Sequence, residues 1–183
     1  MERCAECGFE YDDAHLPTIS ATIRALAAEH AEIQTTADPA ALRRRREPAT
    51  WSALEYGCHL RDVLLVQRER LLAARRTDTP VAEPMGRDER AEHDGYADQA
   101  PIDIARQLTD AAALLTHAYD RLGPADRERR LVYTYPERAE RSLGWLALHT
   151  AHELRHHLLD VERQGFGRSK RLAKRWHGAS TSA

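Results

Sequence analysis

Apolar residues recur every three or four positions in four separate stretches of the chain, which is the spacing of one buried helix face. These stretches predict helices over residues 17–38, 52–72, 101–122 and 142–164. Polar and charged residues occupy the intervening positions, so each helix has one face to bury. Four amphipathic helices with little strand between them predict an all-α four-helix bundle.

Helix-end signals agree with this division. Ser52 has Glu55 three positions later, the pattern of a capping box at the start of the second helix. Pro17 suits the first residue of the first helix, because its missing N–H is not needed there. Gly165 suits the residue that follows the last helix.

The remaining segments carry weaker patterns. Prolines and glycines interrupt residues 75–100 repeatedly, so we expect a long loop that is either a lid or disordered. Residues 131–135 are the one strand-like stretch. The expected organisation is an N-terminal lead over residues 1–14, the bundle over residues 15–166, and a flexible basic and serine-rich tail over residues 167–183.

Composition excludes several classes of function. The 183 residues suit one domain, with 31% charged and 42% hydrophobic residues. A formal net charge of −2 gives no general attraction to nucleic acid. No apolar run approaches the roughly 20 residues that cross a bilayer, and no apolar signal segment begins the chain. We therefore expect a cytoplasmic protein with neither a nucleic-acid nor a membrane partner.

Histidines concentrate in the last predicted helix. Four of the ten lie between residues 149 and 157, where His149, His152 and His156 share one stripe and His157 is rotated off it, toward apolar neighbours. Two imidazoles one turn apart can hold one divalent metal ion, because their side chains converge. The stripe therefore predicts a metal site.

The same stretch, His152-Glu153-Leu154-Arg155-His156, also matches the zinc-protease signature, in which the glutamate is the general base. The extended form of that signature needs a glycine and a histidine where this chain has Leu159 and Glu162. Too little chain remains for a later helix to provide another ligand. We therefore expect the third ligand upstream, and Glu153 remains a candidate catalytic residue.

The three cysteines are Cys4, Cys7 and Cys58. Cys4 and Cys7 are separated by two residues and followed by glycine, which is the form of half a zinc knuckle. A second cysteine pair is missing, so histidines or a second subunit would have to complete such a second metal site. The alternative is two thiols on a frayed terminus.

Two segments together resemble the DinB-like superfamily, including its mycothiol-dependent maleylpyruvate isomerase branch. They are Trp51-Ser52-Ala53-Leu54-Glu55-Tyr56-Gly57-Cys58-His59-Leu60 and the later His152-x-x-x-His156-His157. The similarity covers most of residues 15–165. It implies an up-down-down-up four-helix bundle, often a homodimer, with zinc or nickel held by one histidine of the second helix and a pair on the fourth.

Carried onto this chain, the resemblance implies His59, His152 and His156 as the metal ligands. His149 lies one turn before His152 and is a candidate further ligand or hydrogen-bonding partner. Asp160 lies one turn after His156 and is a candidate acceptor for its free ring nitrogen, which would fix the tautomer.

Three functions remain open at this stage. The first is a metal-dependent enzyme that activates a low-molecular-weight thiol such as mycothiol for transfer to, or isomerisation of, a small electrophile, with Arg61, Arg68 or Arg87 holding acidic substrate groups. The second is a hydrolase that uses metal-bound water, with Glu153 as base. The third is a non-enzymatic, stress-related metal-binding module, which a site closed by four protein ligands would favour. A protease ranks last, because no strand is expected beside the site to dock a peptide.

Overall fold

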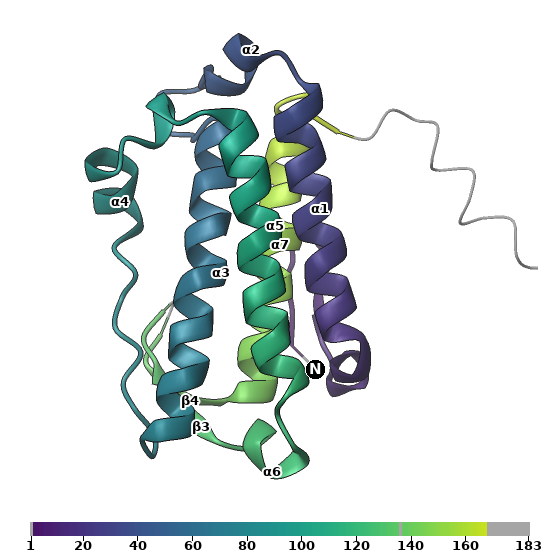
Figure 1. The fold of residues 1–183 in the computed structure, drawn as a ribbon, viewed down its shortest axis with the longest axis vertical. Coiled ribbons are helices and arrows are strands. Elements are labelled where there is room, and N and C mark those ends of the chain that lie inside the picture. Colours follow the sequence, from purple (N-terminus) through teal and green to yellow (C-terminus); the bar gives the residue numbers. More distant parts are fainter. Residues whose placement is uncertain (1, 136, 168–183) are drawn as a thin grey trace, which may run out of the picture.

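Four long helices form the bundle in the computed structural model, which describes residues 2–135 and 137–167 (Figure 1). They are α1 (Ile19–Thr36), α3 (Ala53–Arg76), α5 (Pro101–Asp120) and α7 (Leu143–Arg163). Their directions follow the expected up-down-down-up order: α1 and α7 run one way along the bundle, and α3 and α5 run the opposite way (Figure 1). The predicted all-α bundle is confirmed.

Shorter elements connect the long helices. They are β1 (Glu2–Arg3), β2 (Glu10–Tyr11), the 3-10 helix η1 (Asp13–Thr18), α2 (Pro39–Arg43), α4 (Arg87–His93), the 3-10 helix η2 (Tyr96–Asp98), α6 (Pro124–Arg127), β3 (Arg130–Tyr133) and β4 (Ala139–Ser142). The strand-like stretch is confirmed as β3, which pairs antiparallel with β4 in the register Leu131 opposite Arg141. The sequence did not predict β4, because its polar residues lack an apolar alternation. β1 and β2 form a second antiparallel hairpin.

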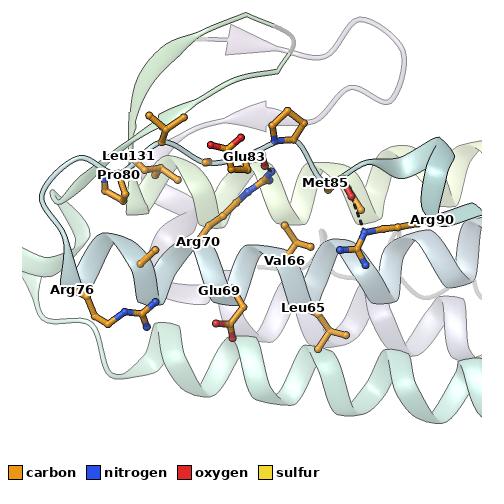
Figure 2. Close-up of a pocket in the computed structure, with 14 residues that line it drawn as sticks. Leu65, Val66, Glu69, Arg70, Arg76, Pro80, Glu83, Met85, Arg90 and Leu131 are labelled. Atoms are coloured by element: carbon orange, nitrogen blue, oxygen red, sulfur yellow. Dashed lines mark hydrogen bonds between the residues drawn. The ribbon is translucent and has the colours of Figure 1, made fainter. Parts of the chain in front are cut away.

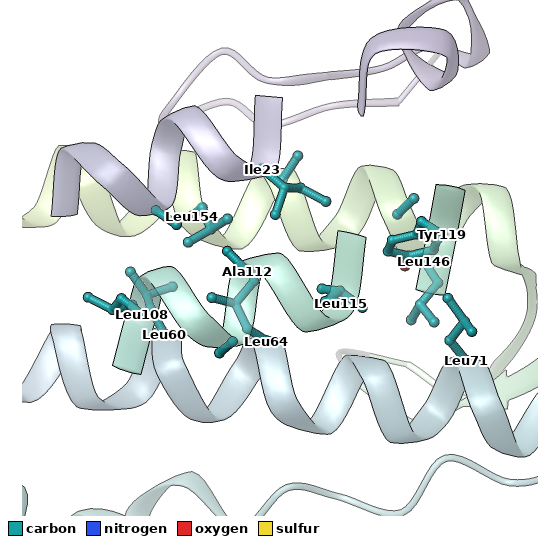
Figure 3. Packing of buried hydrophobic residues seen from close by; sticks show 14 of the residues in the cluster. Ile23, Leu60, Leu64, Leu71, Leu108, Ala112, Leu115, Tyr119, Leu146 and Leu154 are labelled. Carbon is teal, nitrogen blue, oxygen red and sulfur yellow. The ribbon is translucent and has the colours of Figure 1, made fainter. Parts of the chain in front are cut away.

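Each long helix packs mainly against two others. α1 contacts α5 and α7, and α3 contacts the same two, so α1 and α3 lie diagonally across the bundle. Apolar side chains from these helices meet between them (Figure 3). Ile23, Leu60 and Leu115 are among the side chains with no exposed surface. Burying such a side chain contributes about 1.5 to 3 kcal/mol, which fixes the rotation of each helix about its axis.

The long stretch between α3 and α5 has a topological cause. Because these two helices run in the same direction, residues 77–100 must return along the whole bundle (Figure 1). The stretch is not the unstructured loop expected from its prolines and glycines, since it contains α4 and η2. Tyr96 has 0% exposure and donates its hydroxyl hydrogen bond to Asp62 at 2.5 Å. This anchor ties the return segment to α3.

The start of α3 is held by the predicted capping box. The Ser52 hydroxyl accepts from the Glu55 N–H, and the buried Glu55 carboxylate accepts from the Ser52 N–H at 2.8 Å. Arg45 donates to both oxygens of that carboxylate, at 2.8 and 2.5 Å. Burial raises the pKa of Glu55, but these hydrogen bonds outweigh it and leave the pKa below its usual value. Arg45 therefore fixes the start of α3.

The ends of the bundle differ slightly from expectation. Pro17 lies inside η1, and α1 begins at Ile19. Gly165 follows α7 with a φ of +92°, a conformation suited to glycine, which confirms it as the residue after the helix. The expected flexible tail falls almost wholly on residues 168–183, which lie outside the described residues. Within the described part, no helix combines the length and apolar character that crossing a bilayer requires.

Candidate metal centre

His59 meets two side chains of α7 between the helices. Antiparallel packing brings the first turns of α3 beside the last turns of α7. One potential ligand atom each from His59, Glu153 and His157 lies within 4.8 Å of the others. We call this group the interhelical site.

The His59 imidazole is buried without a complete set of partners. Its side chain is only 3% exposed, and its Nδ1 has no hydrogen-bond partner among the described residues. Burial lowers the pKa of His59 to about 3, helped by the nearby charges of His157 and Arg87. The ring is therefore neutral near pH 7, the state in which imidazole binds a metal ion. An unpaired buried polar atom is costly, so a missing ligand fits here.

The His157 ring is oriented by a carboxylate. Its Nδ1 donates to Asp160 Oδ2 at 2.9 Å, while its Nε2 faces Glu153 Oε2 at 3.7 Å. Burial raises the pKa of Asp160, but the His157 hydrogen bond and neighbouring positive charges bring it below its usual value. An ionised carboxylate behind one ring nitrogen leaves the other free to act as a ligand. Asp160 thus has the expected role, but its partner is His157 and not His156.

Aromatic rings enclose the two histidines. Trp51 lies 5.0 Å from His59 between ring centroids, and Tyr56 lies 5.0 Å from His157. Burial raises the pKa of Tyr56 to about 12, so its hydroxyl stays protonated. These rings lower the local dielectric, which strengthens electrostatic interactions within the site.

The structure does not bring the three predicted ligands together. His59 lies with Glu153 and His157, whereas His152 and His156 lie with Cys4 and Cys7. On α7, His152 with His156 and Glu153 with His157 both have the one-turn spacing of a metal-binding pair. The second pair is offset from the first by one residue, which is about 100° around the helix. The stripe of three histidines faces the N-terminal hairpin. The apolar neighbours of His157 were the available signal that it faces α3.

Glu153 lies among several imidazoles. Its Oε1 is 3.7 Å from His149 Nε2 and 4.0 Å from His152 Nδ1, and its Oε2 faces His157. This position places the carboxylate inside the ligand group, where a general base would need to stand apart from it. His149 is buried, stacks on Trp145 at 4.6 Å, and shares a 2.9 Å hydrogen bond with the Tyr11 hydroxyl. With His152 and Glu153 it forms a further group whose potential ligand atoms lie within 4.8 Å of one another, so it adjoins the interhelical site through Glu153.

Of the three candidate arginines for substrate binding, two are occupied. Arg61 donates to Asp62 at 2.7 Å and to two glutamine side chains, and Arg68 donates to Glu69 at 2.6 Å. Arg87, the first residue of α4, is 56% exposed and has a 3.7 Å ion pair with Asp88. Its charge nevertheless acts on both His59 and Tyr56.

The groove drawn in Figure 2 lies between the later turns of α3 and the return segment. Its lining includes none of the three interhelical residues. Arg70 donates to the Glu83 carbonyl at 2.5 Å and Arg90 to the Met85 carbonyl at 2.7 Å (Figure 2). Arg70 thus ties the return segment to α3, and Arg90 braces that segment internally. Both arginines have structural partners, and the groove contains no interhelical residue, so the chemistry is assigned to the interhelical site.

Comparisons with known proteins agree with the geometry. The model of the DinB superfamily matches residues 22–161. The fold is similar to the solved structure of YfiT from Bacillus subtilis, described as a probable metal-dependent hydrolase with an unusual four-helix bundle topology. That similarity has a TM-score of 0.70 at 14% identity and covers 85% of this chain and 91% of YfiT. No curated protein matches the chain.

Proposed function

This chain belongs to the DinB superfamily, and we propose on that premise that its interhelical site binds one divalent metal ion and serves a metal-dependent enzyme. The observation that carries the proposal is the grouping of His59 with Glu153 and His157 around a buried imidazole whose Nδ1 lacks a hydrogen-bond partner among the described residues. Two imidazoles and one carboxylate are the donor set of several catalytic zinc sites, which keep a position open for water or substrate. Zinc is therefore our first choice of metal and nickel the second.

Activation of a low-molecular-weight thiol fits the surrounding residues best. A bound divalent metal would act as a Lewis acid and lower the pKa of a thiol or water. Both carboxylates at the site are engaged, since Glu153 belongs to the ligand group and Asp160 holds His157. A free thiol starts from a pKa of about 8.5 and water from about 15.7, so a metal without a neighbouring base ionises a bound thiol more completely than bound water, and the thiol proton is released to solvent. We therefore place transfer or isomerisation with a thiol such as mycothiol first.

Arg87 is the proposed contact for an acidic substrate or thiol. It is the one of the three candidate arginines with an exposed side chain whose charge acts on His59. The Arg87→Ala substitution should raise the half-saturating concentration of a carboxylate-bearing ligand roughly tenfold, which is equivalent to one lost charge-assisted contact. An uncharged ligand of similar size should bind as before. Equally weakened binding of both ligands would show that Arg87 does not recognise the carboxylate.

Hydrolysis is the second candidate function. The description of YfiT as a probable metal-dependent hydrolase favours it, as does the set of two histidines and one glutamate. In this version the general base would have to come from the substrate or solvent rather than from Glu153. A non-enzymatic metal-binding module is disfavoured by the three-ligand site, which leaves a coordination position open.

Metal analysis tests the site itself. Purified protein is stripped, reloaded with Zn²⁺ and measured by elemental analysis beside His59→Ala and His157→Ala. Each variant should lose about one metal equivalent relative to wild type. His117→Ala serves as the control, since His117 lies exposed on α5. Full metal content in both site variants would refute the proposed ligands.

Cobalt substitution separates the two reactions. Addition of mycothiol to the cobalt form should increase sulfur-to-cobalt charge-transfer absorption, and His59→Ala should abolish that increase while any band present before addition remains. No increase with thiol, combined with ester cleavage that needs no thiol, would replace the first reaction by hydrolysis. The expected homodimer is a separate prediction, measured by sedimentation.

A further inference from the structure

We propose that Cys4, Cys7, His152 and His156 bind one zinc ion as a closed tetrahedral site that fastens the N-terminal hairpin to α7. One ligand atom from each of these four side chains lies within 4.8 Å of the other three. The group contains no member of the interhelical site. We call it the terminal site.

The hairpin turn is shaped to present both thiols. The Gly8 N–H donates to the Cys4 carbonyl at 3.0 Å, and the Cys4 N–H donates to the Phe9 carbonyl at 2.9 Å. Gly8 adopts a φ of +73°, which a side chain would disfavour. This tight turn folds Cys7 back over Cys4, so both sulfur atoms face α7. Cys4 and Cys7 form half of a zinc knuckle in the sequence, and the histidines of α7 complete the set of four ligands.

The two histidines are prepared to supply the other half. The Cys4 thiol lies 3.6 Å from His156 Nδ1. The Tyr11 hydroxyl lies 2.8 Å from His152 Nδ1, while His152 Nε2 is buried and has no partner among the described residues. A metal bound at Nε2 requires the proton on Nδ1, which then donates to Tyr11. An unpartnered nitrogen of this kind points to a missing ligand.

The donor set indicates both the metal and the kind of site. Two thiolates and two imidazoles are a zinc donor set, typical of structural tetrahedral sites. All four coordination positions come from one chain, so neither a second subunit nor a substrate is required. The terminal site therefore differs in chemistry from the three-ligand interhelical site.

The hairpin needs such a fastening. Its two strands have two residues each, too few to be stable alone. Once held against α7, the hairpin places Tyr11 beside both His149 and His152. With His152 donating to it, Tyr11 can donate its own hydrogen to His149 Nδ1, which leaves His149 Nε2 protonated toward Glu153. The terminal site thus positions a hydrogen-bonded chain that ends at the interhelical site.

The test compares metal content and spectra of the full chain under reducing conditions. Wild type should bind about two Zn²⁺ and, with Co²⁺, show sulfur-to-cobalt charge transfer without added thiol. The variant with both Cys4→Ser and Cys7→Ser should bind about one Zn²⁺ and lose that band. Cys58→Ala, which removes a buried thiol outside both sites, should keep both signals. Retention of two zinc ions or of the band in the double variant would overturn the proposal.

Other readouts keep the two sites distinguishable. His59→Ala should remove one zinc ion but leave the charge-transfer band, so failure at the interhelical site does not imitate failure at the terminal site. Hydrogen exchange of residues 2–11 should accelerate in the double-cysteine variant and remain slow in His59→Ala. Equal exchange of this segment in wild type and the double-cysteine variant would show that zinc does not fasten the hairpin.

Discussion

His30 should make the stability of the bundle depend on pH in a predictable way. This histidine lies on α1 with 1% exposure, and its Nε2 donates to the Leu154 carbonyl at 3.0 Å. Burial lowers the pKa of His30 from 6.5 to about 4, against the raising effect of that hydrogen bond. The folded protein therefore keeps the ring neutral over a range in which the unfolded chain takes up a proton.

The direction and size of the effect follow from this difference. Above the unfolded pKa of 6.5 the ring is neutral in both states, so His30 leaves stability unaffected by pH. As the pH falls below that value toward the folded pKa of about 4, protonation favours the unfolded chain. From about pH 7.5 to about pH 4.5 the free energy of unfolding should fall by about 2.5 kcal/mol through His30 alone.

Urea unfolding of wild type and His30→Gln at the two pH values isolates this contribution. Glutamine can donate to the Leu154 carbonyl but does not titrate. A chelator in every sample removes metal release from the comparison, and titration of the other histidines and carboxylates is common to both proteins. The wild type should lose about 2.5 kcal/mol more than the variant on acidification. Parallel losses in the two proteins would refute the reasoning, because His30 would then titrate alike in the folded and unfolded states.

Three further substitutions test other parts of the structure. Gly57→Ala should destabilise the fold by about 1 to 2 kcal/mol in urea unfolding, despite the better helix propensity of alanine, because its Cβ would meet Gln34 Nε2 at 2.7 Å. Ser52→Ala should cost about 1 kcal/mol in the same assay, since the α3 capping box is lost. Asp160→Asn should weaken metal binding at the interhelical site roughly 10- to 100-fold in chelator competition, because the His157 ring loses its carboxylate.

Matched variants sharpen these three tests. In a Gln34→Ala background, Gly57→Ala should destabilise less, with Ile104 Cγ2 at 3.1 Å as the remaining close contact, and equal effects in both backgrounds would contradict the clash with Gln34. Ser52→Gly should cost only a few tenths of a kcal/mol, and a cost equal to that of alanine would argue against lost capping. Asp110→Asn makes the same charge change at an exposed site on α5 and should leave metal affinity unchanged. Equal metal affinity of the Asp160 and Asp110 variants would show that the Asp160 carboxylate does not support metal binding.

Local patterns predicted most of the fold for physical reasons. Apolar spacing identifies the buried face of each long helix, and Ser52 with Glu55 marks a helix start, because these interactions join residues within one or two turns. The return segment was predicted less well. Its length follows from α3 and α5 running in the same direction, and its anchor is the contact of Tyr96 with Asp62. Neither fact is visible in a short window of sequence.

The sequence by itself determined which side chains could bind metal: the histidines of α7, His59, and the pair Cys4 and Cys7. It also fixed their angular relation, because neighbours on a helix are about 100° apart. Only the tertiary structure decided which pair on α7 faces which partner. The rotation of α7 about its axis depends on packing against α1, α3 and the hairpin together, and that rotation turns His157 toward His59 and His156 toward Cys4.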